Sequence, residues 1–171
     1  MNLSFLRQNK SNQEINLFKN IISHPQNLNF FKENKYIYRS LYDLCQRIPV
    51  KYQKKLLSLP GIIFLPVSKV YACSVSPSSN ENLIFLFPDL LKKLACVDNT
   101  EGLAILAHEI GHLFHEHSRR KIEPLEAQIE ADDFAFKIGL GKELSDVLAK
   151  FTDIDSRTRL SFLTSKNISN Q

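Results

Sequence analysis

Hydrophobic residues recur with helical spacing through the first third of the chain. Ser11-Asn-Gln-Glu14 has the form of a capping box, and apolar residues follow it at helical intervals until Pro25. This pattern predicts a first amphipathic helix. A second helix is predicted from about Glu33 to Arg47, and a short helical turn, KYQKKLLSL, follows Pro49. We therefore expect residues 1–59 to form an N-terminal helical extension.

The pattern changes after Pro60 to short apolar runs that are rich in branched and aromatic residues. The runs GIIFLP, KVYACSV and NLIFLF are separated by Pro, Ser and Asn, which is typical of strands. The segment SPSSNEN, residues 76–82, is interpreted as a hairpin loop, so the sheet is predicted to be small and mostly antiparallel. The remainder reads as helical, with breaks at residues 121–124 and 139–141. Residues 60–171 are therefore predicted to be one α+β domain.

Composition and charge exclude several classes of protein. The net charge of +4 is too mild for a dedicated nucleic-acid-binding protein. The longest apolar stretches fall far short of the ~20 residues that cross a bilayer, so no integral membrane segment is expected. The three cysteines include no C-x-x-C pair, which favours buried thiols in a reducing compartment over a disulfide scaffold. We expect a cytoplasmic protein.

Four of the five histidines lie between residues 108 and 117, within a helical run that contains the motif H-E-x-x-H. At about 100° per residue, His108 and His112 project from one face of the helix, one turn apart, and can bind one Zn²⁺ ion. Glu109 is placed to act as general base toward water activated by the zinc. His115 and His117 are interpreted as solvated residues near the end of the helix. The motif predicts a zinc hydrolase.

A third ligand is expected from the next helix, which opens with Pro124, because catalytic zinc sites keep three protein ligands and an open position. If the two helices are antiparallel, His112 faces the neighbourhood of residues 128–132. Proximity then admits Gln128, Glu130 and Asp132.

The segments LAHEIGH and IEADDFAFKIG resemble the gluzincin metallopeptidases, in particular the HtpX-like family of zinc endopeptidases. The likeness covers roughly residues 60–165. It implies a zinc-dependent endopeptidase with one Zn²⁺ per chain, a protein or peptide substrate, and a small sheet packed on the zinc helix. A similar arrangement occurs in ImmA/IrrE-like proteases, which cleave repressors, so an antirepressor protease stays open as an alternative.

The chain departs from these families at one position. Their third ligand is a Glu four residues before the Asp of the E-A-D element, and here that residue is Gln128. On a helical wheel Gln128 and Asp132 lie between two apolar stripes, whereas Glu130 lies on the polar face. Three alternatives remain: Gln128 ligates weakly through its amide oxygen, Glu130 reaches the metal, or the metal site is degraded. Asp132 is expected to orient a ligand histidine by accepting its other N–H.

Near the C-terminus, Arg157 and Arg159 resemble the arginine-containing segment of HtpX-like domains. One arginine could stabilise an oxyanion, or both could pair with the local aspartates. The sequence thus predicts a zinc endopeptidase. The alternative function is a catalytically impaired, metallopeptidase-like interaction module. A regulatory protein partner is also compatible with the sequence.

Overall fold

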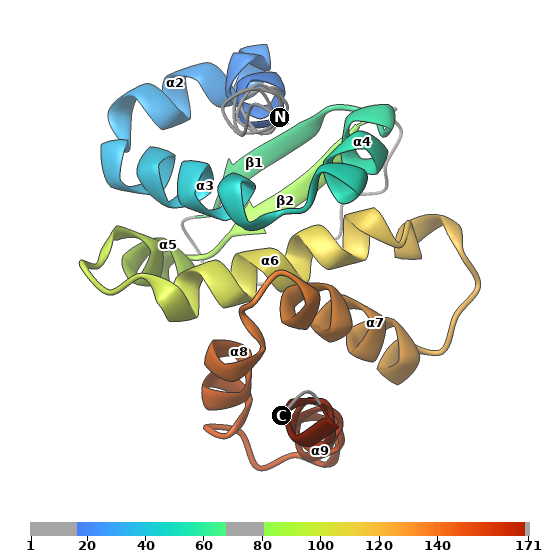
Figure 1. Cartoon of the computed structure of the whole chain (residues 1–171). Coiled ribbons are helices and arrows are strands. Elements are labelled where there is room, and N and C mark those ends of the chain that lie inside the picture. The colour runs from blue at the N-terminus through green and yellow to red at the C-terminus, as the bar shows by residue number, and fades with distance from the viewer. Residues whose placement is uncertain (1–16, 68–80, 170–171) are drawn as a thin grey trace, which may run out of the picture. The chain divides into compact units, whose positions relative to one another are not determined.

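The computed structural model describes residues 17–67 and 81–169 of the chain (Figure 1). It contains two compact units, one within Met1–Ala95 and the other within Cys96–Gln171. The boundary predicted at residue 60 stays a prediction. Among the described residues, no helix combines the length and the apolar character needed to cross a membrane.

The first unit consists of helices and two strands. Residues 17–23 are helical, which agrees with the first predicted helix, although the capping box at residues 11–14 lies outside the described residues. The other elements are α2 (Pro25–Glu33), α3 (Lys35–Arg47), α4 (Val50–Ser58), β1 (Ile62–Pro66), β2 (Asn82–Leu86) and α5 (Pro88–Ala95). Pro25 does follow the end of a helix as predicted, but it also begins α2, which the sequence pattern did not reveal. Proline suits that first helical position because an N–H group there would have no intrahelical partner, so no hydrogen bond is lost.

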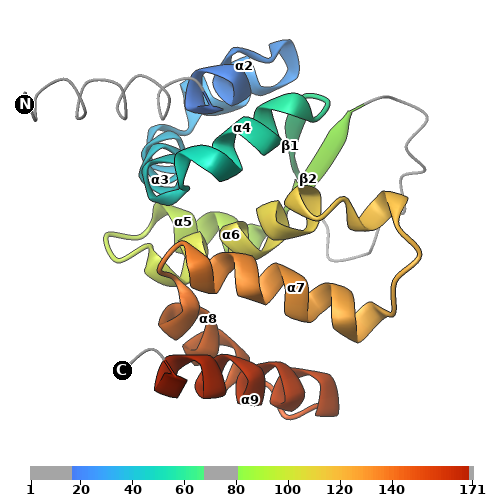
Figure 2. The same ribbon diagram turned by 45° about the vertical axis from the view of Figure 1, so that its right-hand side comes forward.

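The prediction of a mostly antiparallel sheet is wrong. β1 and β2 are parallel, with Ile62 opposite Asn82 and Pro66 opposite Leu86, and both views show them side by side (Figures 1 and 2). Apolar runs reveal the presence of strands but not their relative direction, and residues 67–81 are long enough to return the chain for a parallel pairing. The expected strand KVYACSV and most of the expected hairpin loop lie outside the described residues.

The buried side chain of Asn27 joins α2 to β1. Its amide Nδ2 donates to the carbonyl oxygens of Ile21 (2.8 Å) and Ile62 (2.7 Å), and its Oδ1 accepts from the backbone N–H of Phe64 (2.8 Å). A fully buried amide is tolerated in a core because these three bonds satisfy it.

Every secondary-structure element found among the described residues of the second unit is a helix or a helical turn. The elements are α6 (Thr100–Phe114), the 3-10 turn η1 (His117–Arg119), α7 (Pro124–Lys137), α8 (Gly141–Leu148) and α9 (Ile154–Ser169). The predicted helix with H-E-x-x-H is α6, and α7 begins at Pro124 as expected. The expected break lies at Gly139, whose φ of 81° ends α7 in a left-handed conformation that suits glycine.

Helices α6 and α7 run side by side in opposite directions (Figures 1 and 2). Gly111 permits this close approach, because a Cβ atom at this position would lie 2.8 Å from the carbonyl oxygen and 2.9 Å from the Cα of Ala131. The crossing brings the histidines of α6 against the polar residues of α7.

Candidate metal centre

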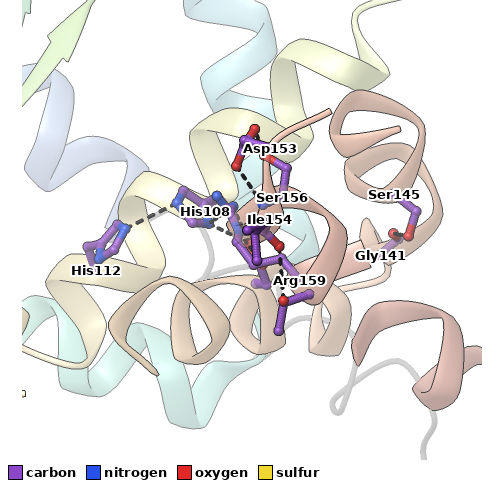
Figure 3. Close-up of polar contacts among 10 residues, drawn as sticks. His108, His112, Gly141, Ser145, Asp153, Ile154, Ser156 and Arg159 are labelled. Atoms are coloured by element: carbon purple, nitrogen blue, oxygen red, sulfur yellow. Dashed lines mark hydrogen bonds and ion pairs between the residues drawn. The ribbon is translucent and has the colours of Figure 1, made fainter. Parts of the chain in front are cut away.

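His108 and His112 point toward one another from α6. Their Nε2 atoms are 3.1 Å apart, with the two ring planes nearly perpendicular, and Figure 3 marks the contact by a dashed line between the two side chains. His108 is buried and His112 is partly buried. Burial lowers the pKa of His112 to about 4, and the neighbouring His108, His117 and Arg159 act in the same direction. His112 is therefore a neutral imidazole at neutral pH.

His108 is held from behind by Asp132 of α7. The Nδ1 of His108 lies 2.7 Å from Asp132 Oδ1. Arg159 of α9 donates to both oxygens of the same carboxylate, from Nε at 2.7 Å and from Nη2 at 2.8 Å. Burial alone would raise the pKa of Asp132, but the bonds from Arg159 and His108 outweigh burial and hold the pKa below its ordinary value. The ionised carboxylate therefore orients the ring of His108.

The Nδ1 of His112, on the side of the ring away from His108, has a different partner. This atom lies 2.7 Å from Nδ1 of His117, and Nε2 of His117 lies 2.9 Å from Oε2 of Glu130. Arg120 donates to Glu130 Oε2 at 2.8 Å. Hydrogen bonds from His117 and Arg120 lower the pKa of Glu130 to about 2. The chain of contacts therefore ends at an ionised carboxylate.

The positions of the protons follow from these partners. The Nδ1 of His108 and the Nε2 of His117 each face a carboxylate, which only accepts, so both of these nitrogens carry a proton. If the rings are neutral, the remaining nitrogen of His117 is an acceptor, and His112 donates to it from Nδ1. In that arrangement both Nε2 atoms at the centre present lone pairs to one another.

Two lone pairs facing each other at 3.1 Å repel unless a proton or a metal ion lies between them. At Zn–N distances of ~2.0–2.1 Å, nitrogens with this separation subtend an angle of about 100° at the metal, close to the tetrahedral value. The donor set is also the imidazole pair that zinc prefers. The two residues therefore fit a zinc ion.

The other predicted site residues occupy distinct positions. Glu109 follows His108 on α6 and is partly exposed; within residues 17–67 and 81–169, no hydrogen bond or ion pair of its carboxylate is found.

Gln128 lies one turn before Asp132 on α7, and since α7 runs antiparallel to α6, this places it toward the His112 end of the pair. Within the same described ranges, its amide forms no hydrogen bond with either histidine. The carboxylate of Glu130 contacts His117 and Arg120 instead of the paired Nε2 atoms.

The two C-terminal arginines, Arg157 and Arg159, lie in different surroundings. Arg159 reaches the site and donates two hydrogen bonds to Asp132 of α7, and its Nη2 lies 3.5 Å from Nδ1 of His108. Arg157 is exposed. We therefore describe Arg159 as the anchor of Asp132.

Sequence reasoning missed the contacts of His117. Glu116 adopts a left-handed conformation, with φ 55° and ψ 40°, directly after α6. This turn brings His117 back to His112, and only 7% of the His117 side chain is exposed. A left-handed glutamate carries no recognisable sequence signal. His115, His117 and Glu130 offer ligand atoms within 4.8 Å of one another, which makes them a second group that could hold a metal ion.

Comparison with known proteins gave one match. The model of peptidase family M48 matches residues 51–154, which include the whole of α6 and α7. No match was found among curated proteins or among solved structures.

Proposed function

The chain belongs to peptidase family M48, and on this premise we propose that it is a zinc-dependent endopeptidase of the HtpX-like type. Membership of a peptidase family implies a protein or peptide substrate. The observation that carries the zinc proposal is the approach of the Nε2 atoms of His108 and His112 to 3.1 Å from one face of α6. A cytoplasmic location and a regulatory partner stay predictions.

His108 and His112 would hold the metal ion, each oriented through its Nδ1. A zinc ion at this position supplies Lewis acidity, which acidifies water and polarises the scissile carbonyl. Glu109 lies beside His108 on α6, and its carboxylate accepts the proton of the attacking water. The same carboxylate then returns this proton to the nitrogen of the leaving amine.

Gln128 is our proposed third ligand, through its amide oxygen. Its support is that Gln128 lies one turn before Asp132, the partner of His108, on a helix that runs antiparallel to α6. Glu130, the alternative, is engaged by His117 and Arg120. A neutral amide gives the metal less charge than the carboxylate expected from the family resemblance. We therefore expect weaker zinc binding than a carboxylate would provide.

A peptide-library digest with added zinc tests the proposal. The wild-type protein should cleave internal peptide bonds, and Glu109→Gln should lose cleavage while binding zinc as before, because the amide cannot accept the proton. Glu126→Gln is the matched control, since Glu126 is exposed on α7, and should cleave like the wild type. Equal cleavage by Glu109→Gln and the wild type would refute the role of Glu109.

Gln128 also favours one rival function, a metallopeptidase-like interaction module that has lost the third carboxylate. This rival predicts no cleavage by the wild-type protein in the same digest, together with binding of intact protein partners.

A further inference from the structure

His117 and Glu130 lie behind His112, away from the paired Nε2 atoms, and the proposed reaction gives neither of them a task. We propose that they form a positioning pair, which fixes the ring orientation and the tautomer of His112 as a metal ligand. This inference rests on the proposed zinc site.

For a neutral His117, the contacts leave only one arrangement of protons. Its Nε2–H donates to Glu130 at 2.9 Å, so its Nδ1 accepts the proton of His112 Nδ1 at 2.7 Å. His112 must then offer its metal-binding nitrogen, Nε2, without a proton. Since 7% of the His117 side chain is exposed, water is largely kept from replacing these contacts.

The two ligand histidines are supported in parallel ways. Behind His108 the contacts run directly to Asp132, which is held by Arg159. Behind His112 they run through one additional imidazole to a carboxylate that is held by an arginine. Metal-binding histidines commonly donate their other N–H to a fixed acceptor, and loss of that acceptor typically costs about 10- to 100-fold in metal affinity.

His115, His117 and Glu130 could instead hold a metal ion of their own. A metal on Nε2 of a neutral His117 would move the ring proton to Nδ1, where it would face the N–H of His112 at 2.7 Å. Arg120 already places a positive charge 2.8 Å from the carboxylate oxygen that the metal would need. These two conflicts favour the positioning pair.

The test measures zinc affinity and stoichiometry in the 171-residue chain by competition with a chromophoric chelator. We expect His117→Ala and Glu130→Ala to weaken zinc binding about 10-fold or more. His117→Asn should retain near wild-type affinity, because its Oδ1 can occupy the place of the ring Nδ1 and accept from His112. In the His117→Asn background, Glu130→Ala should have no further effect. Glu126→Ala, an exposed carboxylate on the same helix, is the matched control and should bind like the wild type.

Several results would overturn the positioning pair. Unchanged zinc affinity in His117→Ala would do so, and so would a second zinc equivalent in the wild type that Glu130→Ala alone removes. Thermal unfolding of the metal-free proteins identifies a merely structural role: lower stability with unchanged zinc affinity also counts against the inference. Failure of the proposed function looks different, because the wild type itself would then bind no zinc.

Discussion

Replacement of Asp132 by Asn tests how the second unit combines stability with the metal site. Asp132 is fully buried and accepts two bonds from Arg159 and one from His108, at 2.7–2.8 Å. An asparagine has one acceptor oxygen, and its NH₂ group would face one of these donors. Removal of one partner from a buried ion pair typically costs about 3–5 kcal/mol, and we expect a loss of that size in the free energy of unfolding. If the NH₂ group faces His108, the ring proton moves to Nε2 and zinc affinity falls.

The assay is urea unfolding of the metal-free wild-type and Asp132→Asn proteins between pH 7 and pH 2. Because the folded-state pKa of Asp132 is lowered, its stabilisation is present in full above the unfolded-state pKa of about 3.9. It is lost as the pH falls through the folded-state pKa. The stability difference between the two proteins should therefore be largest near pH 7 and shrink below about pH 4. Equal stability at pH 7, or a difference that is independent of pH, would show that the ionised Asp132 does not stabilise the fold.

Three further predictions concern single substitutions. Gly111→Ala should destabilise the protein by about 1–3 kcal/mol and weaken zinc binding, because the new Cβ would lie 2.8 Å from backbone of α7; wild-type values in chemical unfolding and zinc titration would contradict this. Gln128→Glu should tighten zinc binding in chelator competition, since a carboxylate adds charge to the third-ligand position; unchanged affinity would place Gln128 outside the site. Asn27→Ala should lower the free energy of unfolding by about 1–3 kcal/mol for each buried backbone group left without a partner, and a smaller loss would mean that water replaces the amide.

The sequence was sufficient to predict the position of a side chain where the spacing of residues along a helix determines it. His108 and His112 are four residues apart, so any α-helix brings them to one face, and Asp132 could be identified because a buried carboxylate between apolar stripes needs a partner. These inferences need only the helical period and the cost of burying a charge.

Other features depend on tertiary structure. The relative direction of β1 and β2 follows from the path of the chain, which apolar runs do not encode. The return of His117 toward His112 depends on a left-handed Glu116, and the pairing of Arg159 with Asp132 depends on how α9 packs against α7. No local pattern reports either contact.

The central claim is that the facing nitrogens of His108 and His112 hold a zinc ion. The most direct measurement is zinc stoichiometry by equilibrium dialysis at pH 7.0–7.5, for the wild type, His108→Ala and His112→Ala. If the two nitrogens hold the metal ion, the wild type binds one zinc per chain, and both variants lose it. A wild type without zinc, or variants that retain it with unchanged affinity, would show that these histidines are not the ligands.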